Sequence, residues 1–313
     1  MAFDVSVVGL YIVDILGRPV EQIPAGGGVD FIDEIRMTVA GTAGGTAISN
    51  AHLDMNVRAV GAVGSDEKAD FLVDSMNRAG IDTACVQRLT GVPTSATILN
   101  IRPNGERPAL HCRGASDHFT VPDDQLDAVC DTRYLHLGGT GLLQAMDGEP
   151  SRRLLAAAKA RGCTTTFDLI AASAETLELV RPLLPYVDYF IPSVEEAQAM
   201  SGRDDPAEMA AFFRDLGAGT CAITLGGEGA YVAGPDAAFR QPAFDVRVHD
   251  TTGCGDAFSA GFIAGLNRGF DLRRTARFAA AAASLVATGL GSDAGIESFA
   301  ATERAMAEMR ELG

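Results

Sequence analysis

The stretch that decides the fold is Asp250-Thr251-Thr252-Gly253-Cys254-Gly255-Asp256. Residues 243–248 before it alternate apolar and polar side chains and predict a strand, while apolar residues after it recur at helical spacing. We therefore expect a Gly-x-Gly turn that joins a strand to a helix. The first N–H groups of such a helix lack intrahelical partners, so small residues there let an anion approach the backbone. Asp256 stands in the first turn, where a carboxylate is also typical of a simple capping residue.

Composition narrows the class of protein. The chain has 313 residues and a formal net charge of −16, which argues against nucleic acid or an anionic membrane as a partner. Its 47% hydrophobic residues are enough for the core of one large α/β domain. Neither Lys68 nor Lys159 follows a glycine, so the GxxxxGK[ST] phosphate loop is absent and the Walker-type kinases are excluded.

The cysteines and the amino terminus predict the cellular location. The six cysteines show no CxxC or Cys/His metal spacing, which is typical of reduced thiols in the cytoplasm. The start of the chain has no basic segment, and no apolar run reaches about 18 residues, so neither export nor membrane insertion is expected. We therefore expect a soluble, cytoplasmic protein.

Periodicity predicts a doubly wound α/β sheet interrupted by two hairpins. Segments 11–20 and 30–39 read as one hairpin, and 94–102 and 106–112 as a second, joined at Pro103-Asn104-Gly105. A glycine-rich turn at 41–46 is expected to open a helix. Strands are predicted at 5–10, 57–64, 134–137, 164–169, 186–191 and 221–225, and helices at 151–161, 174–181, 195–200, 207–216, 272–288 and 300–312.

Together these motifs resemble the ribokinase-like (PfkB) family of sugar and nucleoside kinases, from Val5 to about Gly291. The family's carboxy-terminal signature reads approximately Asp-Thr-x-Gly-Ala-Gly-Asp, with Cys254 here in place of Ala. The resemblance implies that the backbone of Gly253, Cys254 and Gly255 forms the anion hole for the transferring phosphoryl group, with Asp256 as the general base. Cys254 itself suggests a nucleophile with a lowered pKa at a helix amino terminus, but no His/Asn partnership supports that role.

The resemblance also implies an acceptor site. Gly44 and Gly45, followed by Ser49, are similar to the family's Gly-Gly turn before a helix that carries Asn; Ser49 takes the Asn position, and Asn50 is the alternative. Asp14 corresponds to the acceptor of substrate hydroxyl hydrogen bonds. The Asn that ribokinases place two residues before it is Ile12 here, which weakens ribose as the substrate.

On the donor side, the segment 224–229 resembles the family's nucleotide loop and implies that Thr224, Gly226 and Gly229 bind ATP. The segment that contains Gly291 is expected near the adenine. The remaining implied ligands are Glu196 for Mg²⁺, acting indirectly because the neighbouring family Asn is Ser193, and Asp250 and Thr252 for a monovalent cation such as K⁺.

The resulting prediction is a Rossmann-like three-layer α/β sandwich with a small discontinuous β-sheet lid. Residues 1–10, 40–93 and 119–313 form the core, and residues 11–39 and 94–118 form the lid. The expected reaction transfers the γ-phosphoryl group of ATP, with Mg²⁺, to a primary hydroxyl of a sugar or sugar acid. The alternatives are a nucleoside kinase of the adenosine type and, from another class, a non-catalytic sugar- or nucleotide-binding sensor. The resemblance also implies a homodimer formed through the lid.

Overall fold

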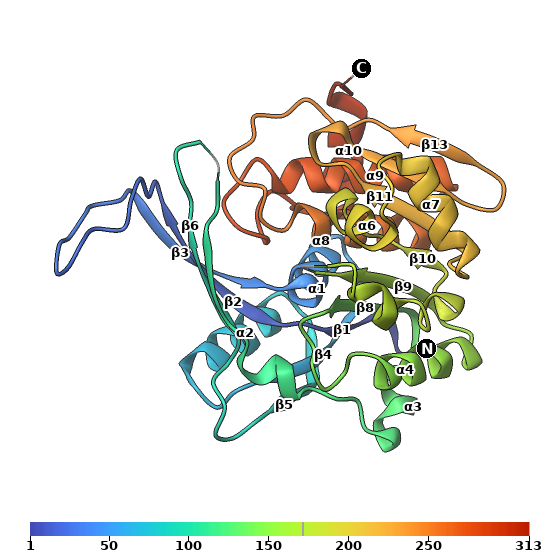
Figure 1. The fold of residues 1–313 in the computed structure, drawn as a ribbon, viewed down its shortest axis with the longest axis horizontal. Coiled ribbons are helices and arrows are strands. Elements are labelled where there is room, and N and C mark those ends of the chain that lie inside the picture. The colour runs from blue at the N-terminus through green and yellow to red at the C-terminus, as the bar shows by residue number, and fades with distance from the viewer. Residues whose placement is uncertain (105, 171, 313) are drawn as a thin grey trace.

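The computed structural model describes residues 1–104, 106–170 and 172–312. Within them, a nine-stranded sheet has the order β13-β12-β11-β10-β9-β8-β1-β4-β5 (Figure 1). Neighbouring strands are parallel except at one edge, where β12 pairs antiparallel with both β11 and β13. The strands are β1 (Phe3–Gly9), β4 (Val57–Val63), β5 (Asp82–Arg88), β8 (Thr132–Thr140), β9 (Thr164–Leu169), β10 (Tyr189–Phe190), β11 (Thr220–Thr224), β12 (Ala230–Ala233) and β13 (Ala238–Gln241).

Helices cover both faces of this sheet (Figure 1). One face packs against α1 (Thr42–His52), α2 (Glu67–Arg78), α8 (Cys254–Asn267), α9 (Leu272–Val286) and α10 (Phe299–Glu308). The other packs against α3 (Leu126–Val129), α4 (Glu149–Ala160), α5 (Thr176–Val180), α6 (Val194–Ser201) and α7 (Pro206–Asp215). Short 3-10 turns are η1 (Gly114–His118), η2 (Asp123–Gln125), η3 (Leu184–Tyr186) and η4 (Gly226–Glu228).

Successive side chains on a strand point to opposite faces, so neighbouring Val7 and Val8 on β1 enter two different apolar clusters. This arrangement confirms the predicted three-layer sandwich.

A second, four-stranded sheet has the order β3-β2-β6-β7 and projects beside the large sheet (Figure 1). Its strands are β2 (Ile12–Arg18), β3 (Glu34–Ala40), β6 (Ala96–Asn100) and β7 (Ala109–Cys112). Each predicted hairpin is an antiparallel pair, and the two hairpins join through parallel pairing of β2 with β6. Both hairpins are thus confirmed, although Gly105 of the second turn lies outside the described residues.

The predicted strand at 243–248 is wrong. The segment contributes one isolated bridge, between Phe244 and Glu311, and otherwise has no regular structure. The last strand, β13, ends just before Pro242, which has no N–H to continue a ladder. The apolar residues of 243–248 line a pocket instead, together with Asp245. The antiparallel pair β12 and β13 was missed.

The glycine-rich turn is also placed differently from the prediction. Helix α1 begins at Thr42, with Gly41 as its N-cap at φ +85°, so Gly44 and Gly45 lie inside the helix. Glycine inside a helix costs about 1 kcal/mol relative to alanine, so its presence needs a packing reason. The predicted strand at 186–191 is likewise reduced to the two residues of β10, because η3 occupies 184–186.

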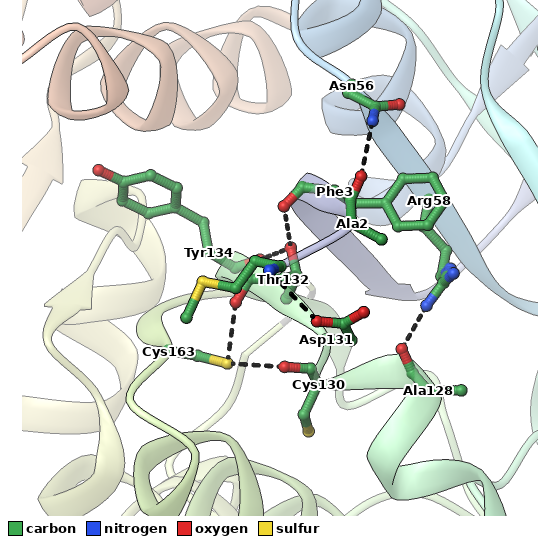
Figure 2. A network of polar contacts seen from close by, with 11 residues as sticks. Ala2, Phe3, Asn56, Arg58, Ala128, Cys130, Asp131, Thr132, Tyr134 and Cys163 are labelled. Atoms are coloured by element: carbon green, nitrogen blue, oxygen red, sulfur yellow. Dashed lines mark hydrogen bonds and ion pairs between the residues drawn. The ribbon is translucent and has the colours of Figure 1, made fainter.

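A polar network holds β1 in place at the amino end of the large sheet (Figure 2). Thr132 donates to the carbonyl oxygens of Phe3 and Tyr134, and the guanidinium of Arg58 lies 4.0 Å from the centre of the Phe3 ring. The thiol of Cys163 donates to the carbonyls of Cys130 and Thr132, and all six cysteines are free thiols. These contacts join β1 to β4 and β8 at the amino ends of the strands. Among the described residues, no helix has the length and apolar character to cross a membrane.

Candidate active site

The larger pocket, of about 520 Å³, lies at the carboxyl ends of the central parallel strands. Leu10, Leu142 and Ile170, which follow β1, β8 and β9, line it. Ligands of open α/β sheets bind at this edge, where the strand order reverses. The four-stranded sheet and the amino end of α8 complete the wall, with Ile12, Asp14, Thr97, Leu99, Arg107, Ala109, His111, Thr252, Gly253, Gly255 and Asp256.

A second pocket, of about 280 Å³, lies beside the loop that follows β11. Thr224, Gly226 and Gly229 line one side, and α9 lines another with Ala280, Ala283 and Ala287. The irregular segment 243–248 supplies part of the remaining wall, and the lining as a whole is largely apolar. Such a pocket suits a flat aromatic ring better than a charged group.

The two pockets meet at the amino end of α8, because Gly255 lines both. Gly253 is the N-cap, at φ +81°, and the helix has no side-chain cap. The first intrahelical bond of the ladder runs from the Ala257 N–H to the Gly253 carbonyl, at 2.8 Å. A Cβ added at Gly255 would meet no atom within 4 Å, so the backbone here is open to a ligand. A helix amino terminus of this kind favours an anion.

Asp256 lies on the larger-pocket side of this junction and is half-buried. Burial raises its pKa well above the ordinary value, and the negative charges of Asp14 and Glu196 raise it further. A carboxylate with a raised pKa has the proton affinity that a general base requires near neutral pH.

Helix α1 packs against Asp256. A Cβ added at Gly45 would lie 2.2 Å from Asp256 Oδ2, and Thr46 Oγ1 donates to the Asp256 carbonyl at 3.3 Å. Gly45 therefore lets α1 approach the carboxylate and does not itself line the larger pocket. Gly44 and Ser49 also lie outside that lining, so the structure does not bring these two expected substrate residues to the pocket.

Asp14, on β2, does line the larger pocket. Burial raises its pKa to about 6, and the hydrogen bond with Thr97 opposes that shift. Neither Asp14 Oδ1 nor the hydroxyl of Thr42 has a hydrogen-bond partner among the described residues, although both are buried and both residues line the pocket. A buried polar atom without a partner is costly, so these two atoms are suited to the hydroxyl groups of a ligand.

Glu196 and Ser193 form the first turn of α6. They make a capping box, in which the Ser193 hydroxyl accepts from Glu196 N and the Glu196 carboxylate accepts from Ser193 N. Ser193 thus has the cap function that Asn also performs well. Burial raises the pKa of Asp168 well above its ordinary value, and the negative charges of Glu196 and Asp256 raise it further.

The remaining predicted ligands are bonded to one another. Asp250 accepts hydrogen bonds from Thr252 and from the Gly291 N–H, and Gly291 lies outside the lining of the smaller pocket. Ala283 and Ala287, which precede Gly291 in the chain, do line that pocket. The pKa of Cys254 is raised to about 12, chiefly by burial and then by Asp250, so the idea of a lowered pKa at this thiol is wrong.

Sequence reasoning missed five polar residues of the larger pocket. They are Thr42, Thr97, Arg107, His111 and Ser292. Thr97, Arg107 and His111 lie on the hairpin β6–β7, and the pairing of its strands determines that they face the pocket. Alternation along β6 and β7 predicts two faces but does not say which one covers a ligand.

Known proteins resemble this chain in sequence and in fold. The model of the pfkB family carbohydrate kinases matches residues 2–298, so the chain belongs to that family. It is therefore a phosphotransferase with an alcohol group as acceptor. Relatives include the 2-dehydro-3-deoxygluconokinase of Thermoproteus tenax, 29% identical, covering 87% of this chain and 86% of the relative. The 5-dehydro-2-deoxygluconokinase of Shouchella clausii is 27% identical over 91% and 89% of the two chains.

The fold is shared with solved ribokinases. The structure of Arabidopsis thaliana ribokinase complexed with ribose and ATP superposes with a TM-score of 0.82 at 21% identity, covering 98% of this chain and 99% of that one. The ribokinase of Thermotoga maritima also gives 0.82, at 22% identity, with 98% and 100% of the chains covered. These likenesses confirm the ribokinase-like fold.

Proposed function

We propose that this protein transfers the γ-phosphoryl group of ATP to a primary hydroxyl group of a sugar or sugar acid. The observation that carries the proposal is the shared lining at Gly255, where two pockets meet at an uncapped helix amino terminus. A donor in one pocket and an acceptor in the other would bring the transferring group to that terminus. Phosphoryl transfer depends mainly on such positioning and charge stabilisation.

The smaller pocket takes the nucleotide in this proposal. Its apolar wall of Phe258, Ala283 and Ala287 suits the adenine, and the loop with Thr224, Gly226 and Gly229 lies beside it. Cβ atoms added at Gly226 or Gly227 would meet nothing within 4 Å, so the loop backbone is accessible to the phosphates. The N–H groups at Gly253, Cys254 and Gly255 then form the anion hole.

The larger pocket takes the acceptor. Asp14 Oδ1 and the Thr42 hydroxyl, both without partners among the described residues, would bind its hydroxyl groups. Asp256 removes the proton from the primary hydroxyl as that oxygen forms its bond to the γ-phosphorus and the bond to ADP breaks. The products are ADP, the phosphate ester and the protonated carboxyl group of Asp256.

In this proposal Mg²⁺ lies on the side of Glu196, because hard carboxylate oxygens are the ligands that Mg²⁺ prefers. Burial raises the pKa of nearby Asp168, and the negative charges of Glu196 and Asp256 raise it further. In the described chain, no three His, Cys, Asp or Glu side chains are arranged to hold a metal ion by themselves. This fits an ion bound mainly by phosphate oxygens and water, with Glu196 acting indirectly. When bound, Mg²⁺ neutralises charge on the phosphates.

The four-stranded sheet acts as the lid in this proposal, with residues 11–39 and 94–118 over the core of 1–10, 40–93 and 119–313. Paired residues Asp14, Thr97 and His111 face the pocket across β2, β6 and β7. A lid excludes water, which would otherwise compete with the acceptor hydroxyl for the γ-phosphoryl group and hydrolyse ATP.

The outer face of the same sheet supports a homodimer. Met37, Ile15, Ile98 and Leu110 form one cross-strand row over all four strands. Met37, Ile98 and Leu110 are 40%, 47% and 66% exposed, which is an apolar row without cover on the single chain. A second copy placed on this row would bury it.

The test is ATP consumption against a panel of hexoses, ketoses, sugar acids and nucleosides, with Asp256→Asn beside the wild type. We expect turnover with a sugar or sugar acid, and a loss of kcat on the order of a hundredfold in the variant with unchanged nucleotide affinity. Asp74→Asn, an exposed change on α2, serves as the matched control. Turnover with nucleosides alone would favour the nucleoside kinase, and ligand binding without turnover would favour the sensor.

A further inference from the structure

The carboxylate of Asp250 is enclosed beside the anion hole, with none of its side chain exposed. Its Oδ1 accepts from the backbone N–H of Thr252 at 3.0 Å and from the Thr252 hydroxyl at 2.8 Å. Its Oδ2 accepts from the Gly291 N–H at 3.0 Å. Three of the roughly four acceptor positions of a carboxylate are therefore used within the chain.

A buried carboxylate also needs a positive charge nearby, because burial of an uncompensated charge is costly. Among the ion pairs of residues 1–104, 106–170 and 172–312, Asp250 takes part in one, with Arg107. Arg107 Nη1 lies 3.9 Å from Asp250 Oδ1 and donates to the Thr252 hydroxyl at 2.7 Å. The guanidinium thus contacts both residues that the family resemblance implies as ligands of a monovalent cation.

The position of Arg107 is set by the hairpin β6–β7. Asn100 N donates to the Pro108 carbonyl at 3.1 Å, and Arg102 N donates to the Glu106 carbonyl at 2.9 Å. These two cross-strand bonds flank Arg107 and fix the direction of its side chain toward the larger pocket, which it lines. Its charge acts on the surroundings, since it lowers the pKa of both Asp14 and Cys254 while the Asp250 charge raises both.

The side chains of Asp250 and Thr252 therefore do not fit a monovalent cation well. The Thr252 hydroxyl gives its proton to Asp250 and accepts one from Arg107, and a cation on these oxygens would stand next to a like charge. We propose that the Arg107 guanidinium takes the place of the monovalent cation, so that phosphoryl transfer in this protein needs no K⁺. The inference rests on the proposed kinase function. Because Arg107 belongs to the lid, its charge reaches Asp250 when the lid lies over the site.

The activity test compares KCl with choline chloride at equal ionic strength. Wild-type rates should agree within about twofold, whereas Arg107→Gln should lose about tenfold or more in choline chloride and regain most of the loss in KCl. Arg102→Gln is the control, because Arg102 lies on the same hairpin but pairs with Glu106, at 3.8 Å, away from Asp250. A wild type that needs K⁺ for activity, or an Arg107→Gln variant fully active in choline chloride, would overturn the proposal.

The second measurement needs no substrate and separates this inference from the proposed function. The melting temperature of Arg107→Gln should rise when KCl replaces choline chloride, because K⁺ then binds the folded protein where the guanidinium was removed. The wild type and Arg102→Gln should show no such rise. A K⁺-dependent rise in the wild type, or none in Arg107→Gln, would contradict the replacement even if no acceptor has yet been found.

Discussion

Replacing Gly45 by alanine should damage catalysis by displacing Asp256. The added Cβ would lie 2.2 Å from Asp256 Oδ2 and 2.8 Å from Asp256 Cβ. Since the Asp256 Cβ itself is too close, rotation of the carboxylate cannot relieve the contact, and the backbone of α1 or α8 must move. A displacement of about 1 Å at a reacting group costs on the order of a hundredfold in rate. We therefore expect kcat to fall by about that factor with nucleotide affinity preserved.

Gly44→Ala provides the matched control in the same helix. Its Cβ would lie 3.3 Å from Val39 Cγ1 and 3.5 Å from Tyr11 Cδ1, contacts that small movements can accept. Both variants gain up to about 1 kcal/mol of helix propensity, so that contribution cancels in the comparison. Overpacking at Gly45 should cost about 1–3 kcal/mol in free energy of unfolding.

The assay measures kcat and nucleotide affinity by ADP release, and the free energy of unfolding by urea titration. The expected order of kcat is wild type, Gly44→Ala, then Gly45→Ala far below both. A folded Gly45→Ala variant with kcat within about twofold of the wild type would refute the reasoning, because the base would then tolerate the shift.

Three further predictions concern the pocket and the lid. Cys254→Ala should keep kcat within about threefold, since its raised pKa leaves the thiol protonated and unreactive; loss of all turnover would mean that the thiol takes part in the reaction. Asp14→Asn should move the acid limb of the kcat profile to lower pH: the base must be deprotonated, the Asp14 charge raises the pKa of Asp256, and removing that charge lowers it. An acid limb that stays or moves upward would contradict this coupling. Ile98→Lys should shift the protein from dimer to monomer in analytical ultracentrifugation, because it places a charge in the apolar row, whereas an unchanged mass would place the interface elsewhere.

The sequence was sufficient for the class of fold. Alternating strands and helices from residue 134 onward predict a doubly wound sheet, and Asn104 in a turn between two β-rich segments predicts a hairpin. These signals are local, because each depends on residues that are neighbours in the chain. The signature around Asp256 was also readable, since backbone exposure at a helix amino terminus needs small residues in a fixed order.

Signals that depend on contacts between distant segments were misread. Residues 243–248 look like a strand because they alternate, but they form only one isolated bridge, and most of them line the smaller pocket. Gly44 and Gly45 look like a turn, yet Gly45 is small because Asp256, from a helix over 200 residues later, packs against it. Hydrophobic periodicity indicates that a side chain is buried, but it does not indicate which part of the protein covers it.

What the sequence determined by itself is the layered α/β fold and the turn of small residues at 253–256 that opens a helix, because both follow from local periodicity and backbone chemistry. What only the tertiary structure decided is which charges meet there. Arg107 carries no motif, and no spacing relates it to Asp250, but the pairing of β6 with β7 and of β6 with β2 brings its guanidinium to that carboxylate. The interaction energy of two charges depends on the distance between them, and folding sets the distance between Arg107 and Asp250.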